Sequence, residues 1–203
     1  MRAGVMLTAL AFGLGLAAPA LAAPEIGEPA PAFTAVDSDG KQHSLSDFKG
    51  KTVILEWTNH GCPYVQKHYD TGNMQALQKE TTGEGAVWLT VISSAPGKQG
   101  YVTAEKANEL TEKRDAAPTA VLFDPTGEIG KSYGATATPH MYIVDEEGVL
   151  RYMGAIDDKP TARRKSVETA TNYVKAALAE MEAGKPVSTP VTRAYGCSIK
   201  YAK

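Results

Sequence analysis

The stretch that most constrains the fold runs from an apolar segment, Thr52–Leu55, through a polar turn to Cys62 and Pro63. A continuous run rich in β-branched residues is typical of a strand buried on both faces. Apolar residues then recur at roughly helical spacing from Val65 to Leu77, with Gly72-Asn73 expected to kink or divide the helix. The sequence therefore predicts that a buried strand ends just before Cys62 and that a helix begins just after it.

The position of Cys62 favours a chemical role. A cysteine at a helix start lies beside unpaired backbone N–H groups and the positive end of the helix dipole, and both stabilise a thiolate. Pro63 suits the first helical turn, where its missing N–H costs nothing. We predict that Cys62 is a nucleophile; the alternative is a small buried hydrophobic side chain, the common role of a free cysteine.

The N-terminus has the pattern of a secretory signal peptide, which we assign to residues 1–22. Arg2 supplies a positive charge, residues 3–18 are apolar and uncharged, and Ala20-Leu21-Ala22 fits a cleavage site. The apolar run is shorter than the roughly 20 residues that a spanning helix needs. We therefore predict cleavage, export to the periplasm or secretion, and no stable membrane insertion afterwards.

The rest of the chain predicts one α/β domain, residues 23–184, followed by a C-terminal tail, residues 185–203. A short hairpin around Asp39-Gly40 opens the domain, strand-like and helix-like segments then alternate, and a helix from Thr161 to about Ala183 closes it. The balance of 21 Lys and Arg against 23 Asp and Glu argues against nucleic acid as a partner.

The sequence has two cysteines, Cys62 in the domain and Cys197 in the proline-bearing tail. In an oxidising compartment, either they pair with each other or each awaits an external partner. A cysteine in such an extension is a poor candidate for core packing, so we expect the tail to carry Cys197 to another site.

A family resemblance is visible in Asn59-His60-Gly61-Cys62-Pro63-Tyr64-Val65, and also in the opening segments Ile26–Phe33 and Leu45–Lys51. These stretches resemble the redoxins, the thioredoxin-like group that includes alkyl hydroperoxide reductase/thiol-specific antioxidant proteins and periplasmic thiol-disulfide oxidoreductases. The resemblance implies a thioredoxin-like fold, a three-layer sandwich whose central mixed sheet is flanked by helices. It also implies that Pro139, in Thr138-Pro139, is a cis-proline facing the active cysteine.

The chain departs from the thioredoxin pattern at Val65, where thioredoxins carry the second cysteine of Cys-x-x-Cys. The resemblance then implies a thiol-disulfide oxidoreductase in which Cys62 attacks a protein or small-molecule disulfide and Cys197 resolves the product. An external thiol reductant would reopen the pair. The alternative is a structural disulfide that contributes roughly 2 to 4 kcal/mol by restricting the unfolded chain.

A peroxiredoxin-like antioxidant peroxidase acting on a hydroperoxide is the second prediction. Peroxiredoxins require a threonine three residues before the reactive cysteine and an arginine near the later strand. This sequence has Asn59 at the first place and Pro139 at the second. Both departures favour disulfide exchange.

Two further residues are candidates for the site. Glu56 lies six residues before Cys62, the spacing at which thioredoxin keeps a buried acid that moves protons, although it could equally be an edge carboxylate or a partner for a lysine. We predict that His60 lowers the pKa of Cys62 as a nearby imidazolium.

A third hypothesis is a redox-inert or metal-binding module with a structural disulfide. Such a module would resemble copper-handling proteins of the Sco type and would use Cys62, His60, His140 and Cys197. We expect no resident cofactor and no metal.

Overall fold

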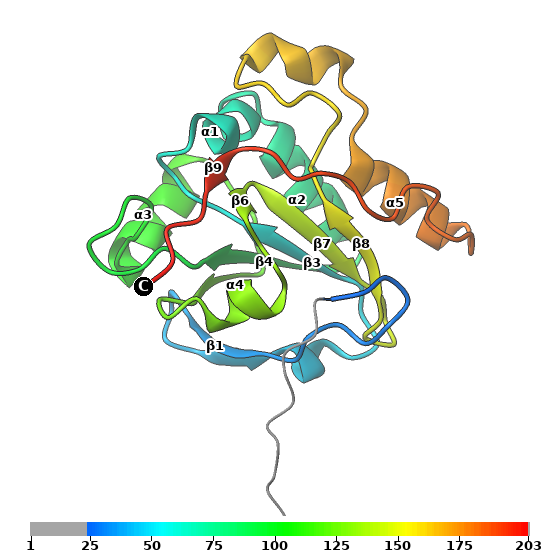
Figure 1. Ribbon diagram of the computed structural model, residues 1–203, viewed down its shortest axis with the longest axis horizontal. Helices are drawn as coiled ribbons and strands as arrows, with labels where there is room; N and C mark the ends of the chain where they lie inside the picture. The colour runs from blue at the N-terminus through cyan, green and yellow to red at the C-terminus, as the bar shows by residue number, and fades with distance from the viewer. Residues whose placement is uncertain (1–23, 203) are drawn as a thin grey trace, which may run out of the picture.

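The computed structural model describes residues 24–202, so the predicted signal peptide lies outside the described residues. A mixed sheet forms its centre, in the order β2-β1-β5-β4-β3-β7-β8 (Figure 1). The strands are β1 (Thr34–Asp37), β2 (Gln42–Ser44), β3 (Val53–Trp57), β4 (Val87–Ile92), β5 (Ala120–Phe123), β7 (His140–Val144) and β8 (Leu150–Gly154). Strands β3, β4 and β5 are parallel, and the remaining pairs are antiparallel.

The helices are α1 (Pro63–Asp70), α2 (Asn73–Gly83), α3 (Ala104–Lys113), α4 (Glu128–Ser132) and α5 (Tyr173–Glu182), with 3-10 turns η1 (Leu45–Phe48) and η2 (Arg164–Thr169). Gly72 separates α1 from α2 with a φ of 74°, in the left-handed region that favours glycine. The division predicted at Gly72-Asn73 is therefore confirmed. None of the described helices is long and apolar enough to cross a membrane.

The sheet separates two hydrophobic clusters because neighbouring side chains of a strand point to opposite faces. Val53, Leu55 and Trp57 of β3 pack in one cluster with residues near α4 and the N-terminal segment. Ile54 points the other way, into a cluster with residues of α1, α2 and α5. All five residues of β3 are buried, so the prediction of a strand covered on both faces is confirmed.

The helix predicted from Thr161 to about Ala183 is wrong in its first half. Residues 164–169 form the 3-10 turn η2, Ala170 is extended, and α5 begins only at Tyr173. The Asn172 side chain caps α5 by accepting from the Lys175 N–H at 3.0 Å. The backbone just before it pairs with the segment after β8, where the Asp158 N–H donates to the Thr171 carbonyl at 3.2 Å. This long-range pairing ends the helical path that the sequence pattern suggested.

The tail runs back across the molecule from α5 and passes over α1 and β6 (Ala137–Thr138) (Figure 1, red). Its strand β9 (Cys197–Ser198) pairs antiparallel with β6, and Thr138 lies opposite Cys197. We call residues 195–199 the strap. The strap closes on the end of the sheet at which α1 begins.

Candidate active site

Cys62 is the N-cap residue of α1, directly before Pro63 at the first helical position. Its side chain is fully buried, and its Sγ lies 3.1 Å from the Thr138 carbonyl oxygen, to which a protonated thiol donates. The Thr138-Pro139 peptide bond is cis, as the resemblance implied. Cys62 and Pro139, 77 positions apart in the sequence, therefore meet at one site.

Cys197 reaches this site through the strap. Both cysteines are free thiols, and Cys197 packs against the cluster that contains Cys62. Gly196 makes the close approach possible, because a Cβ at this position would lie 1.9 Å from the Thr138 carbonyl oxygen. Its φ of 138° is also a backbone conformation that favours glycine.

The two thiols have pKa values shifted in opposite directions. Burial alone would raise the pKa of Cys62, but donors to its sulfur outweigh burial and lower it: the Cys197 thiol, the Val65 N–H and the Thr138 hydroxyl. Burial, together with the bond to Cys62 and the charge of Cys62, raises the pKa of Cys197 to about 12. Of the two thiols, Cys62 therefore loses its proton first, while Cys197 keeps its proton.

The loop before Cys62 is held by Asn59, whose side-chain oxygen accepts from the Gly61 N–H at 3.0 Å. Asn59 also exchanges two hydrogen bonds with Gln99, at 2.7 and 3.0 Å. In the sequence, Asn59 is part of the stretch that resembles the redoxins and a departure from the peroxiredoxin pattern, with no structural role assigned to it. In the structure it fixes the turn that positions the cysteine.

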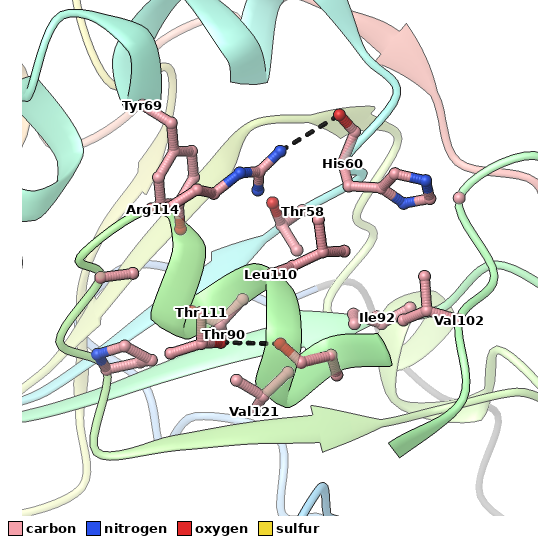
Figure 2. A pocket seen from close by; sticks show the side chains of 14 residues that line it. Thr58, His60, Tyr69, Thr90, Ile92, Val102, Leu110, Thr111, Arg114 and Val121 are labelled. Atoms are coloured by element: carbon pink, nitrogen blue, oxygen red, sulfur yellow. Dashed lines mark hydrogen bonds between the residues drawn. The ribbon is translucent and has the colours of Figure 1, made fainter. Parts of the chain in front are cut away.

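His60 lines a small pocket of about 30 Å³ between α3 and the sheet (Figure 2). Its backbone oxygen accepts from Arg114 at 3.2 Å, and the Arg114 guanidinium lies over the ring of Tyr69. Burial and the nearby charges of Arg114 and Lys106 lower the pKa of His60. A lowered pKa disfavours the imidazolium form of His60, and the predicted effect of a charged His60 on Cys62 stays a prediction.

Glu56 is fully buried on β3 and accepts hydrogen bonds from Tyr69, Gln78, Trp88 and Thr90, at 3.0 to 3.3 Å. Burial raises its pKa above the ordinary value for a glutamate, although hydrogen bonds from Trp88 and Tyr69 act in the opposite direction. This placement agrees with a buried acid rather than with an edge carboxylate or a partner for a lysine. Its role in moving protons for the thiols stays a prediction, because none of these four hydrogen-bond partners is a thiol.

The metal-site hypothesis finds no support in the part of the chain that the structure describes, where no three His, Cys, Asp or Glu side chains are gathered to hold a metal ion. His140 is buried in a polar setting of its own, where its Nδ1 lies 3.3 Å from the Tyr142 hydroxyl. Burial lowers the pKa of His140 to about 4.

Sequence reasoning missed the buried polar cluster that holds the strap. The Tyr195 hydroxyl donates to the Asp157 carboxylate and accepts from Lys67 Nζ at 3.0 Å. Lys67 and Asp157 are themselves ion-paired at 3.3 Å and are 1% and 2% exposed. A glycine directly before Cys197 was the one sequence signal of a close backbone approach here.

Comparison with known proteins places these features in a family. The sequence model of the AhpC/TSA family matches residues 26–153, which includes Cys62 and Pro139 but not the strap. The thiol-disulfide oxidoreductase ResA of Bacillus thuringiensis subsp. konkukian is 28% identical over 124 residues. That alignment covers 61% of this chain and 66% of the relative, so the chain spans just under two thirds of the relative's length.

Solved structures share the fold. An uncharacterised conserved protein of Geobacillus kaustophilus superposes with a TM-score of 0.74 at 25% identity, covering 88% of this chain and 93% of that one. The thioredoxin domain of the thiol-disulfide oxidoreductase BVU-2223 of Bacteroides vulgatus has a TM-score of 0.51 at 23% identity, covering 71% and 96%. The predicted thioredoxin-like α/β fold is confirmed.

Proposed function

Because this chain belongs to the AhpC/TSA family, we propose that it is an exported thiol-disulfide oxidoreductase in which Cys62 is the nucleophile and Cys197 the resolving thiol. One observation carries the proposal: the strap brings the free thiol of Cys197 into contact with the free thiol of Cys62 at the start of α1, with the pKa lowered at Cys62 and raised at Cys197. A purely structural disulfide does not require its two thiols to differ in pKa. The difference in pKa suits a cycle in which the Cys62 sulfur attacks first.

The cycle begins when the Cys62 thiolate attacks a sulfur of a substrate disulfide. The substrate S–S bond breaks, a mixed disulfide with Cys62 forms, and the electron pair leaves on the departing substrate thiolate. The charge at Cys62 disappears in this step, and with it one cause of the raised pKa of Cys197. Cys197 therefore becomes easier to ionise only after substrate is bound.

In the second step the Cys197 thiolate attacks Cys62 Sγ and expels the second substrate thiolate. An external dithiol then reduces the Cys62–Cys197 disulfide and returns both thiols. The segment that ends at Pro139 supports this cycle, because the Thr138 carbonyl contacts Cys62 while the Thr138 backbone pairs with Cys197. Export rests on the N-terminal sequence pattern.

A thiol peroxidase is the second candidate, because Cys62 is fully buried beneath the strap and a hydroperoxide is the smallest oxidant that could reach it. Against it, the groups that stabilise the thiolate in the described structure are a thiol, a hydroxyl and backbone N–H groups rather than a cation. Disulfide exchange is therefore the first choice.

The test uses the reduced mature chain and its Cys62→Ser and Cys197→Ser variants, each mixed with a model protein disulfide or with hydrogen peroxide. With the disulfide, mass spectrometry should find a Cys62–Cys197 bond in the parent and a trapped mixed disulfide in Cys197→Ser, whereas Cys62→Ser should react much more slowly, through Cys197 alone. Stoichiometric consumption of peroxide that is faster than the reaction with the disulfide, with sulfenic acid formed at Cys62, would favour the peroxidase.

A redox titration separates turnover from a structural bond. The pair should open within the range of catalytic redox proteins, above about −300 mV. A potential well below that value would make the bond structural and would contradict the proposal.

A further inference from the structure

The strap occupies the place that an external substrate needs. Cys62 can attack a disulfide only if a substrate sulfur comes to its Sγ, and in this structure the neighbouring sulfur is Cys197. The backbone edge beside Cys62 is β6, which pairs with β9. An extended substrate segment would therefore follow the path that residues 195–199 now follow.

One position on that path, directly before the cysteine, leaves no room for a side chain. At Gly196 a Cβ would lie 1.9 Å from the Thr138 carbonyl oxygen, which is a backbone atom and cannot rotate away. A visiting segment on the same path would have the same restriction. Glycine is thus the residue that fits directly before the attacked cysteine.

The residue before this glycine, Tyr195, lies in a buried polar site. Tyr195, two residues before the cysteine, places its hydroxyl between the ammonium of Lys67 on α1 and the carboxylate of Asp157 after β8. His68 Nε2 lies 3.4 Å from the same oxygen, and the ring of Tyr64 packs edge-on against Tyr195. Lys67, His68 and Asp157 are at most 2% exposed.

The charge pattern of this site matches a phenol. A phenol hydroxyl can accept from Lys67 and donate to Asp157 at the same time, whereas a phenylalanine ring can do neither. Buried charges that lose a hydrogen-bond partner are costly, so the site discriminates strongly against a group without a hydroxyl. The chemistry that holds the strap is therefore also chemistry that can select a substrate.

We propose that Lys67 and Asp157 form a subsite for the tyrosine of an extended peptide substrate with the sequence Tyr-Gly-Cys, in which Cys62 attacks the disulfide of that cysteine. In the resting protein the chain's own Tyr195 fills the subsite. This inference rests on the proposed disulfide exchange and adds its substrate class. The strap is then an internal copy of the substrate segment.

The test compares two peptides, Tyr-Gly-Cys-Ser-Ile and Phe-Gly-Cys-Ser-Ile, each as a mixed disulfide with 5-thio-2-nitrobenzoate. Attack of the Cys62 thiolate on the peptide sulfur forms a Cys62–peptide disulfide and releases the coloured thionitrobenzoate anion, so one S–S bond forms as one breaks. The protein is the full mature chain with Cys197→Ser, which removes the second thiol. Its Tyr195→Ala derivative vacates the subsite, and Tyr101→Ala, at an exposed tyrosine outside the site, is the matched control.

With Tyr195 in place, or in the Tyr101→Ala control, the two peptides should react at similar rates because the subsite is filled. In Tyr195→Ala the tyrosine peptide should react about tenfold faster than the phenylalanine peptide, the size of effect expected for a hydrogen bond to charged groups. Equal rates in Tyr195→Ala, or the same preference in all three proteins, would overturn the subsite.

Two further outcomes are informative. If Tyr195→Ala does not fold, as judged by circular dichroism, Tyr195→Phe keeps the ring and removes only the hydroxyl. It should speed the reaction of both peptides because the strap is held less tightly, and unchanged rates would overturn the inference. If neither peptide releases thionitrobenzoate although Cys62 reacts with iodoacetamide, the proposed disulfide exchange itself is refuted and this inference falls with it.

Discussion

Replacing Gly196 by alanine should detach the strap from β6 and expose Cys62. The added Cβ would lie 1.9 Å from the Thr138 carbonyl oxygen, well inside van der Waals contact, and the φ of 138° is strained for any residue with a side chain. Because the opposing atom belongs to the backbone of β6, no side-chain rotation relieves the overlap. The two strands must separate instead.

The size of the effect follows from the free-energy cost of the backbone conformation alone. Holding a residue with a side chain in such a region costs roughly 1 to 3 kcal/mol, which raises the ratio of open to closed strap by about 5- to 150-fold. The overlap with the carbonyl adds to this. If opening is fast compared with modification, the rate at which iodoacetamide alkylates Cys62 should rise by the same factor.

The assay is alkylation followed by mass spectrometry in a Cys197→Ser background, where Cys62 is the remaining thiol. Gly85→Ala is the matched control, because Gly85 also has a positive φ, 97°, but a Cβ added there would have no neighbouring atom within 4 Å. Both substitutions should lower the free energy of unfolding, and only Gly196→Ala should accelerate alkylation. Equal alkylation rates in the two variants would refute the reasoning.

Three other predictions follow from the titratable groups. Cys197→Ala should raise the pKa of Cys62, seen as an upward shift in the pH profile of alkylation, whereas Cys197→Ser keeps a donor and should shift it less; no shift in either variant would contradict the assigned hydrogen bond. Burial raises the pKa of Glu56, so the wild-type protein loses stability as pH rises from the unfolded pKa of the carboxyl through its folded value. Glu56→Gln should therefore gain stability relative to wild type as pH rises through this window in urea unfolding, and the exposed control Glu84→Gln should not. His140, with its pKa lowered to about 4, contributes stability that is complete above pH 6.5 and is lost as pH falls toward 4, by up to roughly 3 kcal/mol; His140→Gln should flatten this part of the pH–stability curve, and an unchanged curve would remove His140 as its source.

The parts of the fold that the sequence predicted correctly are those governed by neighbouring residues. Cys62-Pro63 marks a helix start because N-cap and first-turn preferences act within a few residues. Gly72 ends one helix through its own backbone freedom. The cis bond before Pro139 came from the family resemblance, since local sequence alone favours trans.

The parts that the sequence could not predict depend on contacts between distant segments. Lys67 and Tyr195 are 128 positions apart, and the residues near each of them in the sequence do not indicate that the two side chains meet. Lys67 is a charged residue on a helix, for which the ordinary expectation is exposure. The helix predicted through Ala170 failed for the same reason, because the pairing of Thr171 with Asp158 is a tertiary contact that overrides helical periodicity.

Cys62 and Cys197 stand 135 positions apart in the chain, yet the folded protein makes their sulfurs neighbours. A disulfide between them would close about two thirds of the chain, residues 62–197 of 203, into a single covalent ring. By the loop-entropy relation, a ring of this size removes freedom from the unfolded chain worth about 5 kcal/mol. One electron pair exchanged with a reductant would thus change the resistance of the whole sheet to heat and denaturant, so that unfolding experiments could read out the redox state of a pair of atoms at one end of it.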